Sequence, residues 1–197
     1  MMKRLFDIVF SFIMLILFVP LFLLMACWIR LDSKGDVFFG QERIGRGGQP
    51  FKLWKFRTMH PKSELHGQLT VGATDSRITR VGYYLRKFKV DELPQLWNVL
   101  RGDMSVVGPR PEVPKYVALY SRQQREVLSI RPGITDYASL KYFEESELLA
   151  KAENPEETYI REIMPAKLKL NSDYLKHQSL PGDIKIILQT GLRILKA

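Results

Sequence analysis

The sequence predicts a mostly helical α+β fold that a re-entrant N-terminal helix attaches to a membrane, with interfacial helices and a small β element. Three observations support this prediction. An uncharged stretch of 22 residues runs from Ile8 to Ile29. Apolar residues recur at helical spacing farther along the chain, and one glycine-rich segment has the alternating residue pattern that is typical of a β-hairpin. We therefore expect a membrane helix at residues 1–31 and a globular domain at residues 32–197.

The apolar segment is long enough for a membrane span but contains a proline. A helix of that length rises roughly 33 Å, and a hydrocarbon core is about 30 Å thick. Pro20 lies near the middle, where it removes a backbone donor and breaks the helix. Lys3 and Arg4 precede the segment, Arg30 and Lys34 follow it, and positive flanks prefer the cytoplasm. A re-entrant helix leaves both positively charged flanks in the cytoplasm, whereas a spanning helix leaves only one of them there, so we favour re-entry.

Charge and composition narrow the classes of partner and cofactor. The net charge of +9 requires an anionic partner, which leaves nucleic acid, an anionic lipid surface or phosphorylated substrates. No run of Lys and Arg exceeds two residues, which argues against a nucleic-acid arm. A single cysteine, Cys27, excludes an intramolecular disulfide. Because Cys27 ends a Leu-Met-Ala-Cys sequence, a secreted lipoprotein is a further alternative.

The rest of the chain divides into short elements. Residues 36–48 with 50–58 predict a hairpin, and Gly45–Gly48 is more typical of its turn than of a phosphate cradle. Helical spacing predicts helices over Val81–Lys89 and Leu93–Leu100, and three prolines predict an extended segment over Val106–Pro114. The acidic stretch Glu144–Glu157 predicts exposed helix and loop. The C-terminal stretch, residues 183–197, predicts an amphipathic helix that packs on the domain or lies on anionic lipid.

The stretch around Asp91 and Glu92 is the strongest candidate for chemistry. By itself an Asp-Glu pair is typical of a helix N-terminus, where Asp91 caps and Pro94 occupies the first turn. The alternative is that Asp91 forms an acyl phosphate with a phosphoryl donor while the adjacent carboxylate holds Mg²⁺. Farther on, two prolines flank Arg110, whose planar guanidinium suits bidentate phosphate recognition.

Taken together, these motifs closely resemble the bacterial sugar transferase family, the monotopic phosphoglycosyl transferases. The resemblance covers most of the chain up to Thr135 and the C-terminal helix, and the matching segments are Lys52–Met59, Asp75–Gly82, Leu85–Lys87, Asp91–Leu100, Arg101–Ser105, Val107–Pro111 and Arg131–Thr135. The chain departs from the family pattern over Asp136–Phe143. The family's helix break is often Ser-Pro, whereas Val19 precedes Pro20 here.

The resemblance implies an enzyme that moves a sugar 1-phosphate from a UDP-sugar to polyprenyl phosphate and releases UMP, with Mg²⁺ as cofactor. Asp91 matches the family's nucleophile and Glu92 its partner carboxylate, and both are the expected metal ligands. Arg86 and Arg110 match phosphate-binding positions, and Lys55 and Arg131 in the matching segments are assigned to the same role.

The resemblance also implies a location and partners. We expect a catalytic domain on the cytoplasmic face of the bacterial inner membrane, bound to anionic lipid and without a nucleic-acid partner. A homo-oligomer remains open. The main alternative is a catalytically silent, lipid-binding adaptor with the same fold, which the intact Asp-Glu pair disfavours.

Overall fold

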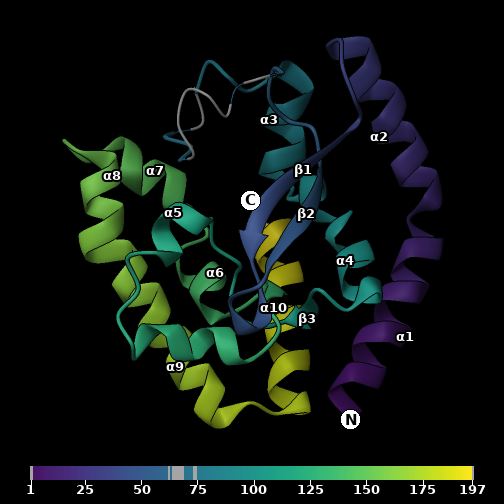
Figure 1. The fold of residues 1–197 in the computed structure, drawn as a ribbon. Helices are drawn as coiled ribbons and strands as arrows, with labels where there is room; N and C mark the ends of the chain where they lie inside the picture. The colour runs from purple at the N-terminus through teal and green to yellow at the C-terminus, as the bar shows by residue number, and fades with distance from the viewer. Residues whose placement is uncertain (1, 62, 64–68, 73–74, 197) are drawn as a thin grey trace.

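The N-terminal apolar segment forms two helices with a bend between them. In the computed structural model, which describes residues 2–61, 63, 69–72 and 75–196, α1 (Met2–Leu17) and α2 (Val19–Asp32) are bent by 60°. The pair runs along one side of the molecule (Figure 1). In this described part of the chain, neither helix alone has the length and hydropathy needed to cross a membrane, whereas the bent pair taken together has both.

The bend lies next to Pro20, as predicted. Pro20 occupies the first turn of α2, where its missing N–H leaves no intrahelical bond unmade. Phe18 departs from helical geometry, with φ −90° and ψ 3°. On either side, the amide of Phe18 still donates to Met14 O at 2.9 Å and that of Phe22 to Phe18 O at 2.8 Å. The break is therefore confirmed and confined to one turn, while its relation to a bilayer stays a prediction.

The predicted hairpin is present. Strands β1 (Phe38–Ile44) and β2 (Pro50–Phe56) pair antiparallel, with Phe38 opposite Phe56 and Ile44 opposite Pro50. Their turn contains a short 3₁₀ segment, η1 (Arg46–Gly48). Gly47 and Gly48 have φ values of 69° and 77°, which only glycine adopts without strain. Gly45–Gly48 thus forms the turn of the hairpin, as predicted.

Helices make up most of the remaining domain. Strands β3 (Ser105–Val107) and β4 (Gly133–Thr135) form a short parallel pair. The predicted helices over Val81–Lys89 and Leu93–Leu100 are confirmed as α3 and α4. The helical elements after the hairpin are α3 (Arg80–Lys87), η3 (Val90–Glu92), α4 (Gln95–Arg101), α5 (Pro114–Val117), η4 (Gln124–Ser129), α6 (Tyr137–Lys141), α7 (Glu145–Ala150), α8 (Pro155–Thr158), the π-helical η5 (Tyr159–Ile163), α9 (Met164–His177) and α10 (Leu180–Leu195).

Three clusters of buried apolar side chains hold these elements together. One cluster joins α2, β2 and α3, and a second joins β2, α4, β3, α9 and α10. The third lies among α5, η4, α7, η5 and α9. The hairpin contributes to the first two clusters, with Phe56 in one and Leu53 in the other. It therefore connects the N-terminal helix pair to the C-terminal helix.

Charged side chains attach the start of α1 to the domain. Lys3 Nζ lies 2.5 Å from Asp183 Oδ2, and the Asp183 side chain is almost fully buried. Arg4 donates to a backbone carbonyl near the end of α4 at 2.8 Å. Asp7 is buried and accepts a hydrogen bond from Ser105 Oγ at 2.8 Å. The first turns of α1, which the sequence marked only as a positive flank, are thus bound to the domain.

The end of α2 is attached to the same domain. Asp32 Oδ2 accepts the amide of Val81 at 3.1 Å. Nearby, Met25 and Ile29 are buried in the cluster that also contains Phe56, Val81 and Leu85. Between the two attached ends, side chains at the bend are exposed, among them Ile16, Leu17 and Val19. The bent pair is therefore held at both ends and bare in the middle.

The C-terminal helix α10 packs on the domain and still leaves an apolar face open. Ile186 is fully buried, Ile187 is partly buried, and Asp183 is buried at the first turn. Four other apolar side chains of α10 are exposed, and we call them the apolar face of α10: Ile184, Leu188, Leu192 and Leu195.

The ion pair between Lys3 and Asp183 generates a stability prediction. Lys3→Met removes the cation and leaves the buried Asp183 carboxylate uncompensated, which is expected to cost about 3 kcal/mol of unfolding free energy. Denaturant unfolding of the detergent-solubilised chain measures it. Adding Asp183→Asn should recover most of the loss, because no buried charge then remains. Equal stability of the single variant and the wild type would show that the pair does not hold α1.

Candidate functional site

A cavity of about 840 Å³ lies between the hairpin, the segment after α3, and the helices α6, α7, α9 and α10. It brings together five of the six side chains that the sequence proposed for the site: Lys55, Arg86, Asp91, Glu92 and Arg110. The sixth, Arg131, is absent from the described lining, and its Nε donates to the Gly102 carbonyl at 2.8 Å. Arg131 thus supports the loop after α4, and its proposed contact with phosphate stays a prediction.

The Asp-Glu pair lies on a single 3₁₀ turn and not at the start of a longer helix. Lys89 precedes η3 in the left-handed region, with φ 54°. This conformation turns the chain sharply between α3 and η3 and places Asp91 inside the domain. The sequence-based interpretation of Asp91 as a helix cap is therefore wrong, since Pro94 precedes α4 and no side chain caps that helix.

Asp91 is buried and incompletely bonded. Its side chain is almost inaccessible, and Oδ1 has no hydrogen-bond partner among the described residues. Burial raises the pKa of Asp91 above its ordinary value, although the positive charges of Lys55, Arg86 and Lys89 oppose that rise. An unbonded carboxylate oxygen within a group of cations is free to approach an anionic ligand.

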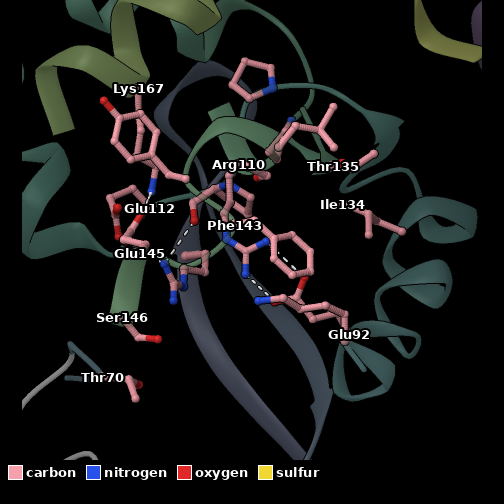
Figure 2. A pocket seen from close by; sticks show the side chains of 18 of the residues that line it. Thr70, Glu92, Arg110, Glu112, Ile134, Thr135, Phe143, Glu145, Ser146 and Lys167 are labelled. Carbon is pink, nitrogen blue, oxygen red and sulfur yellow. Dashed lines mark hydrogen bonds and ion pairs between the residues drawn. The ribbon is translucent and has the colours of Figure 1, made fainter. Parts of the chain in front are cut away.

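Glu92, in contrast, is tightly bound by two cations. Lys55 Nζ lies 2.8 Å from Oε1, and Arg110 grips both carboxylate oxygens, with Nη1 3.0 Å from Oε2. Burial alone would raise the pKa of Glu92, but the charges and hydrogen bonds of Arg110 and Lys55 outweigh it and hold the pKa well below its usual range. Figure 2 shows Glu92 and Arg110 turned toward one another across the cavity. Glu92 is therefore an anion that fixes two cations in place.

The backbone around Arg110 is held rigidly. The Arg110 amide donates to Asp136 Oδ2 at 3.1 Å, and Asp136 Oδ1 accepts the amide of Ser139 at 2.6 Å, which caps α6. Behind this segment, Gly108 and Gly133 touch so closely that a Cβ built on Gly133 would lie 2.1 Å from Gly108 N. The flanking prolines thus act together with β4 and α6 to orient one guanidinium.

Arg86 contributes a further cation at the cavity wall. Its Nη2 donates to Thr70 Oγ1 at 2.7 Å. Burial lowers the pKa of Arg86, and the nearby Asp91 carboxylate opposes that change. The guanidinium has no carboxylate within ion-pair distance in the described part of the chain. Arg86 therefore keeps charge available for a ligand in the cavity.

Sequence reasoning missed a second group of charged residues on the other side of Arg110. Arg43 pairs with Glu112 at 3.1 Å, and Lys167 pairs with Glu145 at 2.7 Å. Figure 2 shows Glu112 and Glu145 on the side of Arg110 away from Glu92. Residues 142–147, which begin at the end of the segment that departs from the family pattern, also line the cavity. Glu112 directly follows Pro111, which is the one signal in the sequence that it lies near the site.

The two carboxylates suit Mg²⁺ only together with ligands from a substrate. Among the described residues, no three His, Cys, Asp or Glu side chains are grouped as a metal site. Mg²⁺ is commonly bound by one or two carboxylates plus phosphates and water. Asp91 Oδ1 is unbonded, and Glu92 Oε2 accepts one hydrogen bond, so each retains an acceptor position. The pair fits an ion that arrives with a phosphorylated ligand.

Comparison with known proteins agrees with this geometry. A family described as bacterial sugar transferase matches residues 1–197. The chain is 38% identical over 200 residues to an Aeromonas hydrophila UDP-N-acetylgalactosamine-undecaprenyl-phosphate N-acetylgalactosaminephosphotransferase, covering 98% of this chain and 43% of that protein. It is 39% identical over 191 residues to a Caulobacter vibrioides UDP-glucose:undecaprenyl-phosphate glucose-1-phosphate transferase, covering 95% and 67%. An Escherichia coli protein of the latter name is 35% identical over 199 residues, covering 96% and 39%. The chain thus spans less than half the length of two of these relatives.

The opposite environments of Asp91 and Glu92 predict opposite effects on stability. Burial raises the folded-state pKa of Asp91, so its ionisation favours the unfolded chain. This cost is absent below the unfolded pKa and develops as pH rises through the folded pKa. Asp91→Asn is therefore expected to raise the free energy of unfolding at pH 7 by about 1 kcal/mol.

Glu92→Gln is expected to lower it by about 3 kcal/mol, because Arg110 and Lys55 lose their anion. The stabilisation from Glu92 is present above the unfolded pKa and is lost as pH falls through the depressed folded pKa. Urea unfolding at pH 7 and at lower pH measures both variants, with the exposed Glu126→Gln as control. Changes of the same sign in the free energy of unfolding of the two variants would contradict the opposite environments of Asp91 and Glu92.

Proposed function

Because the chain belongs to the bacterial sugar transferase family, we propose that it transfers a sugar 1-phosphate from a UDP-sugar to a polyprenyl phosphate and releases UMP. The relatives are named for UDP-sugar donors and undecaprenyl phosphate. The observation that carries the proposal is the buried Asp91 carboxylate, whose Oδ1 is unbonded in a cavity lined by cations. These features suit attack on an anionic phosphorus centre.

Asp91 acts as the nucleophile in a two-step exchange. Its carboxylate oxygen forms a bond to the sugar-linked phosphorus of the donor, and the bond to the second phosphate breaks, so that UMP leaves with that bridging oxygen. Lys55, Arg86 and Lys89 keep the carboxylate ionised against the cost of burial. They also attract the diphosphate, and Oδ1 has no hydrogen bond to another described residue that must break before it attacks.

Glu92 and Arg110 hold the charges around the reacting phosphate. The Arg110 guanidinium is bound to Glu92, and the Arg110 backbone amide is bound to Asp136. Arg110 is therefore held in place beside the ligand with little reorganisation. Mg²⁺, when bound by Asp91 and Glu92 with the donor phosphates, would neutralise the charge that develops on the leaving UMP. Arg86, which has no carboxylate partner among the described residues, binds the donor phosphates directly.

We further propose that α1 and α2 form a re-entrant helix pair in the bacterial inner membrane, with the domain on the cytoplasmic face. Both ends of the pair contact the same domain, through Lys3 at the start and Asp32 at the end. If the pair crossed the bilayer, a hydrocarbon core about 30 Å thick would separate its two ends, and they could not contact the same domain. The exposed apolar side chains at the bend then lie deepest in the lipid. This placement brings Asp91 to the level of a lipid phosphate.

Asp91→Asn is expected to reduce sugar-phosphate transfer to the level without enzyme, since an amide cannot form the acyl phosphate. The assay uses radiolabelled UDP-glucose and UDP-N-acetylgalactosamine with undecaprenyl phosphate and Mg²⁺, and scores label in the lipid phase and UMP. The exposed Asp173→Asn is the matched control. Without the lipid, wild type should retain label that maps to Asp91. Near-normal transfer by Asp91→Asn, or label on another residue, would exclude this nucleophile.

Cysteine labelling tests the topology. With Cys27 replaced by serine, Met2→Cys and Arg122→Cys provide reporter thiols at two exposed positions. The proposed topology puts both on the same side, so both should react only with a reagent on the cytoplasmic side. Pro20→Leu restores a continuous apolar helix of spanning length, so part of the Met2→Cys population should then become reactive from the periplasm. A wild-type helix pair with Met2→Cys labelled only from the periplasm would show a spanning segment.

A further inference from the structure

Two cations from distant parts of the chain meet on one aromatic ring at the cavity. Lys89 Nζ lies 4.9 Å from the centre of the Phe143 ring, and the Arg193 guanidinium carbon lies 5.4 Å from it. Phe143 lines the cavity and lies near Arg110 in Figure 2. Lys89 belongs to the turn before Asp91, and Arg193 belongs to α10. The ring therefore gathers positive charge beside the nucleophile from two separate elements.

The charge of this pair is largely uncommitted. Lys89 has no carboxylate within ion-pair distance in the described part of the chain, unlike Lys55 and Arg110, which both bind Glu92. Arg193 pairs only with Glu144 there, at 3.3 Å, and both of these side chains are at least half exposed. Lys89 and Arg193 are thus the cations nearest Phe143 that can bind an additional anion.

Each of the two cations directly follows an exposed apolar side chain in the sequence. On the α10 side, Leu192 directly precedes Arg193 and belongs to the apolar face of α10. On the α3 side, Phe88 is exposed and directly precedes Lys89, and Tyr84 lies one helical turn before Phe88 and stacks on Trp28 at 6.0 Å. Aromatic side chains of this kind sit at the level of lipid headgroups. The exposed apolar side chains that neighbour both cations in the sequence therefore suit a lipid ligand.

We infer that Lys89 and Arg193, gathered on Phe143, form the binding site for the phosphate of the lipid acceptor. A soluble diphosphate has no need of apolar surroundings, whereas a polyprenyl monophosphate needs cations at the place where apolar surface ends. The inference rests on the proposed function for the identity of the lipid. It assigns the donor phosphates to Arg86 and Arg110 and the acceptor phosphate to a separate pair of cations.

The second step then balances without a further reagent. An oxygen of the dianionic lipid phosphate forms a bond to the phosphorus of the phosphosugar on Asp91. The bond between that phosphorus and the Asp91 oxygen breaks, and the carboxylate is released with its electron pair. Lys89 and Arg193 favour the dianionic form of the lipid phosphate, so no proton has to be removed.

Equilibrium binding of undecaprenyl phosphate to the full chain in nanodiscs, without any donor, tests the site directly. Lys89→Gln and Arg193→Gln should each weaken binding roughly tenfold, as expected for the loss of one charge-assisted contact. Lys89→Arg and Arg193→Lys should restore it. Lys185→Gln is the matched control, because Lys185 is an exposed cation on α10 like Arg193 but is not among the described cations that lie on the Phe143 ring. Wild-type affinity in both Gln variants would overturn the inference.

A second measurement separates this site from the donor site. With UDP-glucose or UDP-N-acetylgalactosamine and Mg²⁺ but no lipid, Arg193→Gln should release UMP in a single burst of wild-type size, because the proposed function gives Arg193 no part in the donor step. Loss of that burst would place Arg193 at the donor phosphates and overturn the inference. Absence of a burst in the wild type would instead count against the proposed function, and the donor-free binding measurement would still decide the lipid site.

Discussion

The ion pairs that join Glu92 to Arg110 and Lys55 are the interaction on which the site depends. They connect three segments distant in sequence, namely β2, η3 and the loop after β3. Each ion would be costly to bury alone, and each is stabilised by the others. Because Glu92 commits two cations, Asp91 beside it can remain a carboxylate with an unbonded oxygen. One carboxylate of the pair thus provides structure, and its neighbour is left for chemistry.

This arrangement has a consequence for stability. A carboxylate that is buried without a full set of hydrogen bonds destabilises the fold, and the raised pKa of Asp91 expresses the same cost. Glu92 contributes in the opposite direction, since its pKa is held low by its two partners. Proteins often retain a destabilising group where function needs it. The local cost at Asp91 is therefore an argument for its role in the reaction.

The helix pair and the cavity are linked through the same core. The start of α1 is bound to Asp183 of α10, while the end of α2 packs against Phe56 of β2, the strand that carries Lys55. Helices α1 and α2 thus pack against elements that also build the site. This continuity supports the proposal of a lipid acceptor, because the helix pair would then set the height of Asp91 relative to a lipid phosphate.

Much of the local structure could be predicted from the sequence, because it depends on residues close together in the chain. Pro20 breaks the apolar helix through its own ring and missing donor, and Gly47 and Gly48 provide the left-handed turn of the hairpin. The motif around Asp91, Glu92 and Arg110 identified the family. Five of the six proposed site residues line one cavity. These predictions needed only local sterics and a recognisable order of motifs.

Tertiary structure alone decided which charges are paired and which are free. Lys3 resembled a positive membrane flank in the sequence, yet it binds the buried Asp183 at the other end of the chain. Arg131 resembled a phosphate ligand, yet it donates to a backbone carbonyl. Phe143 had no visible role until folding brought Lys89 and Arg193 onto its ring. Sequence shows that a side chain is charged or aromatic, but its partners depend on contacts between segments far apart in the chain, and those contacts exist only in the folded protein.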